Sequence, residues 1–162
     1  MLAIEVRADP AFRIMRAAGH ADIYLNGVLQ YKGRPKTGYS CEGEITDLEG
    51  FLVTRCSSFA ANWWRASLDH RTYVIQDDVG TELARIRRHG FFGCDCDISI
   101  EGQELSCPPR GEIVLPGAVL TISPQPLEVR GTLSDENHLP GSMGIAFFLW
   151  MKRAIDDAYT GG

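Results

Sequence analysis

The sequence predicts a mainly β protein, an antiparallel β-barrel or barrel-like sandwich that wraps a buried hydrophobic C-terminal helix. Three observations lead to this fold class. Short segments rich in alternating apolar residues recur between Gly- and Pro-containing turn signals from about residue 4 to 134. One hairpin-like segment occurs twice. Nine consecutive uncharged residues, 143–151, follow these strands in a segment with helical character.

Length and composition indicate one ordinary globular domain. A chain of 162 residues can bury a core of its own, so we expect a single domain over residues 1–162. Hydrophobic residues make up 44% and charged residues 23%, which argues against disorder along the whole chain. The net charge of −5 predicts no nucleic-acid partner, because binding to phosphate backbones needs a basic footprint.

The first predicted hairpin covers residues 21–33 and turns at Asn26-Gly27, a dipeptide typical of tight hairpins. Two further hairpins come from the repeat. "ITDLEGFLVTR" (45–55) aligns with "VIQDDVGTELAR" (74–85), with Asp, Gly and Arg each offset by 30 residues. Each copy is expected to form a strand, an Asp-x-x-Gly turn and a second strand. Acidic residues around the first copy predict an exposed sheet edge that resists pairing: Glu42, Glu44, Asp47 and Glu49.

Residues 93–101 alternate strictly between an apolar and a mainly acidic face, which predicts a half-buried strand. A further hairpin is expected over 111–123, turning at Pro116-Gly117, and a last strand over 125–133. Proline residues separate these strands. The total is roughly nine to eleven strands, at the spacing of a sandwich or barrel.

The helix is expected over about residues 142–159. Pro140-Gly141 stops the preceding chain, and Ser142 is a candidate N-cap. Because the first half of this helix is apolar on all sides, protein or lipid must surround it, and its length is below the roughly 20 apolar residues that a membrane span needs. We therefore expect the sheet to enclose this half, with the charged half emerging from Lys152 onward.

Cysteine usage and the N-terminal sequence predict that the protein is located in the cytoplasm. Five cysteines, an odd number, accompany an N-terminal stretch without the apolar core of a secretory signal. Cys94 and Cys96 share the apolar face of their predicted strand, where buried thiols act as small apolar groups. The spacing of cysteine and histidine residues predicts no metal site, and no motif predicts a cofactor.

Two segments carry a resemblance to a known family: "YVIQDDVGTELARIRR" (73–88) and "GIAFFLWMKRAIDD" (144–157). Together with the many antiparallel strands, they resemble the tubby C-terminal superfamily, in particular its LURP-one-related and scramblase-like members. The resemblance implies a closed antiparallel barrel around a buried C-terminal helix. It also implies a non-catalytic role, either binding of phosphoinositides or membranes through basic residues or service as a scaffold.

Basic residues supply the candidate ligand site. Alternation places Arg85 and Arg87 on one face of a strand, with Arg88 on the other, and Arg55 occupies the matching position of the first repeat. An early segment adds Lys32, Arg34 and Lys36. Since guanidinium groups bind phosphate bidentately, a phospholipid head group is a suitable ligand. The alternative is a solvated strand face on which these cations pair with acids.

Trp63 and Trp64 are candidates for a membrane-surface or protein interface, because adjacent residues of a strand face opposite sides. The alternative is that both rings are covered by the core and a neighbouring strand. No order or spacing of Ser, His, Asp or Cys residues indicates a catalytic centre.

The sequence therefore predicts a non-enzymatic binding or scaffold module that does not span the membrane, either free in the cytoplasm or peripheral at an anionic membrane surface. Two alternatives stay open. One is a small-ligand carrier or enzyme that uses a pocket at the barrel mouth, with Cys107 or His89 as contributors. The other is a protein-interaction module, for example a homodimer formed through Trp63 and Trp64. The sequence leaves the oligomeric state undetermined.

Overall fold

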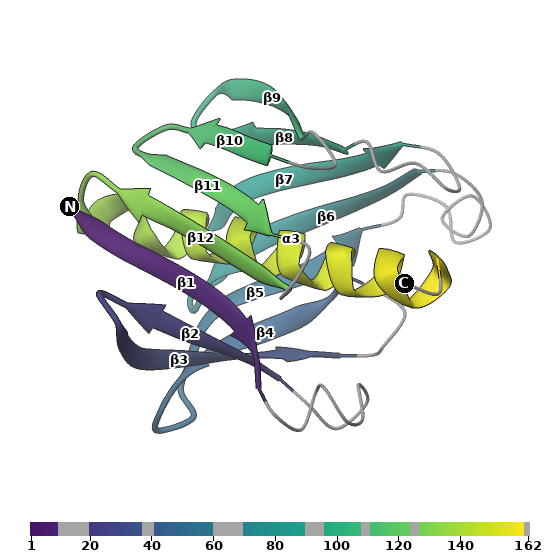
Figure 1. Cartoon of the computed structure of the whole chain (residues 1–162). Coiled ribbons are helices and arrows are strands. Elements are labelled where there is room, and N and C mark those ends of the chain that lie inside the picture. The colour runs from purple at the N-terminus through teal and green to yellow at the C-terminus, as the bar shows by residue number, and fades with distance from the viewer. Residues whose placement is uncertain are drawn as a thin grey trace.

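The computed structural model (Figure 1) describes residues 1–9, 20–36, 41–59, 70–89, 96–107, 111–123 and 127–160. For residues 59, 70, 71, 88, 89, 107 and 156–160 it describes the backbone alone. The described residues form twelve strands, a short 3-10 helix and a long α-helix. These elements are β1 (Leu2–Ala8), β2 (Ala21–Leu25), β3 (Val28–Pro35), β4 (Gly43–Asp47), β5 (Leu52–Phe59), β6 (His70–Asp77), β7 (Glu82–His89), β8 (Cys96–Ile100), β9 (Gln103–Cys107), β10 (Gly111–Leu115), β11 (Ala118–Ser123), β12 (Glu128–Leu133), η1 (Glu136–His138) and α3 (Leu139–Thr160).

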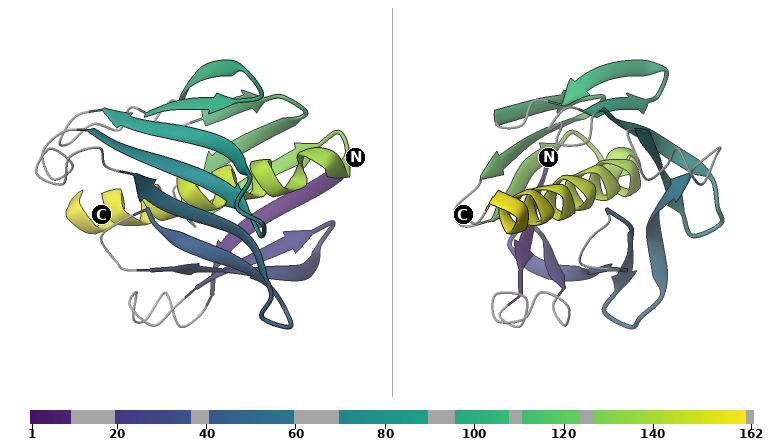
Figure 2. Two further views of the ribbon diagram at one scale, coloured as in Figure 1. Left: turned by 180° about the vertical axis from the view of Figure 1, so that it is seen from behind. Right: turned by 90° about the vertical axis from the view of Figure 1, so that its right-hand side faces the viewer.

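All twelve strands belong to one antiparallel sheet that curls into a nearly closed barrel (Figure 2). The strand order is β10-β11-β12-β1-β2-β3-β4-β5-β6-β7-β8-β9, so β9 and β10 are the edges of the described pairings. Because successive strands run antiparallel, every second turn lies at the same end of the barrel. Short turns after β2, β4, β6, β8 and β10 lie at one end, which we call the hairpin end, at the left of Figure 1. The mainly β prediction is confirmed.

The short turns form as their sequences predict. Asn26 and Gly27 have φ angles of 49° and 80°, the left-handed values that a two-residue hairpin turn requires. Gly117 has a φ of 73° after Pro116, as expected for a type II turn. The predicted hairpins over 21–33 and 111–123 are therefore confirmed, and each has its turn at the expected dipeptide.

The two repeat copies form twin hairpins, β4–β5 and β6–β7. In the first, Asp47 Oδ1 accepts hydrogen bonds from the N–H groups of Glu49 and Phe51, both at 2.9 Å. In the second, Asp77 Oδ1 accepts the equivalent bonds from Val79 and Thr81, at 3.1 and 2.8 Å. The irregularity in pairing also repeats, between residues 45 and 46 and between residues 75 and 76. The offset of 30 residues thus holds for the backbone as well as for the sequence.

The expectation of an exposed acidic edge around the first repeat is wrong. β4 pairs with β3 on one side and with β5 on the other, so it lies inside the sheet. Its acids have local functions instead: Asp47 builds the turn, and Glu44 pairs with Arg55. Charge alone does not identify an edge strand, because an outward-facing acid is equally stable opposite a cation on a neighbouring strand.

Helix α3 runs through the barrel, as the end-on view in Figure 2 shows. It contacts β1, β11 and β12 on one side and β5, β6 and β7 on the other. Trp150, Phe147 and Phe148 are at most 1% exposed. The expected enclosure of the apolar half is confirmed. Among the described residues, no helix has the length and hydropathy to cross a membrane.

Small strand residues make room for the rings of this helix. The ring of Phe147 lies so close to Gly33 and Gly43 that a Cβ there would come within 2.6 and 2.9 Å of it. Phe148 packs edge-on against Tyr73, with ring centroids 5.1 Å apart. On the helix itself, Gly144 lets Ile75 approach closely. The fit of helix to barrel therefore depends on alternating small and large side chains.

Two details at the ends of the helix differ from the sequence prediction. The helix begins at Leu139, not at Ser142, because proline is tolerated in a first helical turn. Asp135 caps the preceding η1 by accepting a hydrogen bond from the N–H of Asn137 at 2.9 Å. Lys152, where the helix was expected to emerge, is only 6% exposed, so the barrel encloses a longer part of α3 than its apolar run.

Candidate functional site

The basic residues predicted from the sequence lie largely on one surface of the sheet. We call this surface the basic face and define it by Lys32, Arg34, Arg55, Arg85 and Arg87, which come from β3, β5 and β7. Arg34, Arg55, Arg85 and Arg87 are exposed, whereas the residues between them point inward: Gly33, Cys56, Ala84 and Ile86 are buried. The predicted orientation of Arg85 and Arg87 is confirmed, and the side chain of Arg88 lies outside the described residues.

Two of these arginines are paired with carboxylates. Arg55 Nε lies 3.2 Å from Glu44 Oε1 on the neighbouring strand β4, and both side chains are about half exposed. Arg85 Nε lies 2.6 Å from Glu82 Oε1 on its own strand. In the register, Arg34 also stands opposite Glu44, so bases and acids alternate across β3, β4 and β5. The charge of Arg55 and Arg85 is therefore largely compensated.

Within the described residues, Lys32, Arg34 and Arg87 form no ion pair. Lys32 and Arg34 lie two residues apart on one side of β3, a spacing of about 7 Å. Arg87 lies four strands away, about 19 Å across the sheet. The fold thus brings Lys32 and Arg34 within reach of one phosphate group, while Arg87 belongs to a separate part of the surface.

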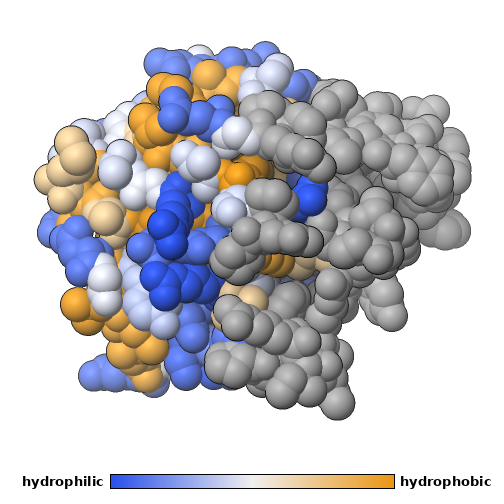
Figure 3. Space-filling model, viewed as in Figure 1, coloured by the Kyte–Doolittle hydropathy of each residue, from blue (hydrophilic) through white to orange (hydrophobic). Residues whose placement is uncertain are grey.

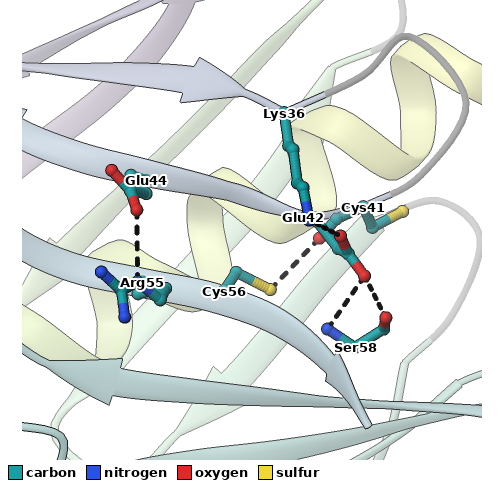
Figure 4. A network of polar contacts seen from close by, with 7 residues as sticks. All are labelled: Lys36, Cys41, Glu42, Glu44, Arg55, Cys56 and Ser58. Carbon is teal, nitrogen blue, oxygen red and sulfur yellow. Dashed lines mark hydrogen bonds and ion pairs between the residues drawn. The ribbon is translucent and has the colours of Figure 1, made fainter. Parts of the chain in front are cut away.

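Lys36 belongs to a polar network at the far end of β3 (Figure 4). Its Nζ lies 3.5 Å from Glu42 Oε2, and the hydroxyl and the N–H of Ser58 both donate to Glu42 Oε1. Burial disfavours the charged form of Glu42, but the hydrogen bonds from Ser58 and the charge of Lys36 outweigh it and lower the pKa of this carboxyl. The network ties the start of β4 to the end of β5, and no motif in the sequence indicated it.

The cysteines beside this network are buried. Cys56 Sγ donates to the carbonyl oxygen of Cys41 at 3.2 Å, and burial raises the pKa of the Cys56 thiol far above its ordinary value. A thiol of this kind is a poor nucleophile at neutral pH, because the thiolate is the reactive form. Cys96 is also buried, as predicted for the apolar face of its strand. Cys94 and the Cys107 side chain lie outside the described residues.

Other sequence candidates lie outside the described residues as well. These are Trp63 and Trp64, the proposed interface pair, and the side chain of His89. Asp97 lies on the outer face of β8 as predicted, whereas Glu101 stands in the β8–β9 turn with a φ of 49° and is not a strand residue. In the described ranges, no three His, Cys, Asp or Glu side chains are arranged to hold a metal ion.

A shallow depression of about 250 Å³ opens beside β7 and β8. Ala84 and Ile100 line it with apolar atoms, and Arg85, Ser99 and Glu101 contribute polar groups at its rim. Arg85 and Ser99 come together because they are direct partners in the β7–β8 register. The sequence offers no signal for this depression, because it depends on which residues of two strands stand opposite each other.

The described residues define the class of protein: a nearly closed, twelve-stranded antiparallel barrel with a C-terminal helix packed against its strands. In comparisons with known proteins, no family model, no curated protein and no solved structure matched the chain.

Proposed function

We propose that the protein is a non-enzymatic binding or scaffold module that meets its ligands on the outer surface of the barrel. The observation that carries this proposal is the position of α3, whose rings Phe147, Phe148 and Trp150 fill the barrel interior at no more than 1% exposure. A small barrel that carries or converts a ligand uses its interior or its mouth for that purpose. In this fold the interior is used for stability, so the outer surface is left for recognition.

The proposed ligand is an anionic phospholipid head group, held on β3 by Lys32 and Arg34. Support comes from their spacing and from the ability of guanidinium to bind phosphate with two parallel hydrogen bonds. Asp22 and Glu44 stand opposite Lys32 and Arg34 in the register, but neither cation forms an ion pair within the described residues. The resemblance to tubby-like proteins favours the same ligand class, and membership of that superfamily is part of the proposal. The protein would then be cytoplasmic and peripheral at the membrane.

Vesicle sedimentation at low salt tests the proposal. Phosphatidylcholine vesicles are compared with vesicles that also contain a phosphoinositide. We expect retention only by the second kind, and we expect Lys32→Glu with Arg34→Glu to weaken it at least about tenfold, since each basic residue near an anionic surface contributes about 1 kcal/mol.

Arg130→Glu is a control for position, because Arg130 is exposed and lies on β12, away from the basic face, where it pairs with Glu128. Charge reversal at Arg85 and Arg87 tests the rest of the face, with a smaller expected loss because Arg85 is already paired. The lipid proposal is wrong if phosphoinositide vesicles do not retain the protein, or if Arg34→Glu and Arg130→Glu weaken retention equally.

A further inference from the structure

The hairpin end of the barrel carries an unusual set of exposed apolar side chains. Leu48 and Phe51 lie on the β4–β5 turn, Val79 lies on the β6–β7 turn, and Val28 follows the β2–β3 turn. They are 55%, 67%, 80% and 56% exposed. Among the large apolar side chains of the described residues, the only others that are comparably exposed are Met1 and Val114. Figure 3 shows apolar surface between hydrophilic atoms at this end of the molecule, on its left side.

These side chains follow successive hairpins around the barrel. The three turns join β2 to β3, β4 to β5 and β6 to β7, so neighbouring turns lie two strands, or about 10 Å, apart. Exposed apolar residues that are scattered singly need no explanation, whereas a set gathered at one end of a molecule indicates an interaction surface.

The twin hairpins show that the turns do not need these apolar residues. At the positions of Leu48 and Phe51, the second hairpin has Asp78 and Thr81, and at the position of Val79 the first hairpin has Glu49. Both turns nevertheless make the same hydrogen bonds to their aspartate. Each of these three apolar residues thus has a polar equivalent in a turn with the same hydrogen bonds, so folding of the turn does not account for its presence.

The hairpin end is predominantly acidic, and two of its acids are paired: Glu82 with Arg85 and Glu101 with His138. The five turns and their flanking described residues contain no lysine or arginine. They carry acids instead: Asp47, Glu49, Asp77, Asp78, Glu82, Glu101 and Glu104. An acidic surface with apolar tips repels an anionic membrane and attracts a partner that combines basic and apolar groups.

We infer that the hairpin end binds a basic amphipathic helix of another protein. The apolar face of the helix would rest on Leu48, Phe51 and Val79, while its lysine or arginine residues would face the surrounding acids. Two helical turns advance about 11 Å, which matches the spacing of neighbouring hairpins. This surface is distinct from the basic face, and the inference stands whether or not the basic face binds lipid.

The test uses a fluorescent synthetic peptide in which leucine and lysine are patterned as an amphipathic helix, and a second peptide with glutamate in place of lysine. Binding to the full chain is followed by fluorescence anisotropy. The decisive variant, called the exchanged variant, replaces each of the three apolar turn residues, or tips, by the residue at the equivalent position of the other hairpin. The substitutions are Leu48→Asp, Phe51→Thr and Val79→Glu. It makes the end more acidic and less apolar. Each new residue already occupies the equivalent position of the other hairpin, so the fold should be retained.

We expect the lysine peptide to bind, the glutamate peptide not to bind, and the exchanged variant to lose at least about tenfold in affinity, as for the central residues of an interface. Val114→Thr, which removes an equally exposed apolar group beside the β10–β11 turn of the same end but outside the three hairpins of the inference, should change affinity little.

Three results would overturn the inference. The lysine peptide fails to bind, or it binds the exchanged variant as tightly or more tightly, which would indicate attraction by charge alone. Phosphatidylcholine or phosphatidylserine vesicles retain the parent chain but not the exchanged variant, which would assign the tips to a membrane. Light scattering shows a dimer that the exchange abolishes, which would assign the tips to a second copy of the chain.

Discussion

The twin hairpins β4–β5 and β6–β7 share their turns, their pairing irregularity and an outward arginine, yet they differ where they face the helix. At the equivalent inward positions 43 and 73, the first hairpin has glycine and the second has tyrosine. Gly43 leaves room for the ring of Phe147, whereas Tyr73 packs edge-on against Phe148. At another pair of equivalent inward positions, the first hairpin has Cys56 and the second has the larger Ile86.

The central helix accounts for this difference between the two hairpins. A helix has no symmetry that would relate the two hairpins, so it presents different side chains to each, and the inward positions must differ to keep the interior close-packed. The outward positions are under no such constraint. Arg55 and Arg85 are both retained there, although one pairs across to β4 and the other along its own strand.

The largest effect is expected from substitutions at the equivalent inward positions 73 and 43. Tyr73→Gly removes the ring that packs against Phe148 and should lower the free energy of unfolding by about 4 kcal/mol. Gly43→Ala should lower it by about 2 kcal/mol, since the new Cβ would lie 2.6 Å from the Arg34 carbonyl oxygen. Chemical denaturation measures both. Tyr73→Phe is the control, and a loss as large as that of Tyr73→Gly would show that the hydroxyl, not the ring, matters.

An intermediate effect, of opposite sign, is expected at the equivalent inward positions Thr54 and Ala84. Thr54 is 1% exposed, and its hydroxyl finds no hydrogen-bond partner among the described residues. Thr54→Val keeps the shape and removes this unsatisfied group, so thermal unfolding should show a stabilisation of about 1 kcal/mol. A destabilised Thr54→Val protein would mean that the hydroxyl has a partner in solution.

The smallest effect concerns Glu42, a feature of the first hairpin alone, since the second has Thr72 at the equivalent position. Because the folded-state pKa of Glu42 is lowered, its contribution is complete above the ordinary pKa of 4.5 and is lost as the pH falls through the folded value. Ser58→Ala should lower stability by about 0.5 kcal/mol at pH 7, because the bond is exposed to solvent, and by less in acid. Equal losses at both pH values would show that Ser58 stabilises the protein independently of the charge of Glu42.

The candidate site illustrates how far sequence reasoning reaches. Alternation along β7 correctly placed Arg85 and Arg87 outward, because side-chain direction in a strand has a period of two. It could not show that Arg85 pairs with Glu82 or that Arg55 meets Glu44. Those contacts depend on rotamers and on register, and within the described residues they leave Lys32, Arg34 and Arg87 as the cations of the basic face without an ion pair.

Local sequence patterns were enough to predict the local structure: hairpins at Asn-Gly, Pro-Gly and Asp-x-x-Gly turns, the repeat with its offset of 30 residues, and an apolar helix that had to be enclosed. These features depend on backbone preferences and on hydrophobic periodicity within short segments. Three features became visible only in the assembled barrel: β4 lies inside the sheet, Lys152 is buried, and apolar turn residues from three hairpins share one end. Register and closure bring together residues that are far apart in the chain, and no local pattern encodes which of them become neighbours.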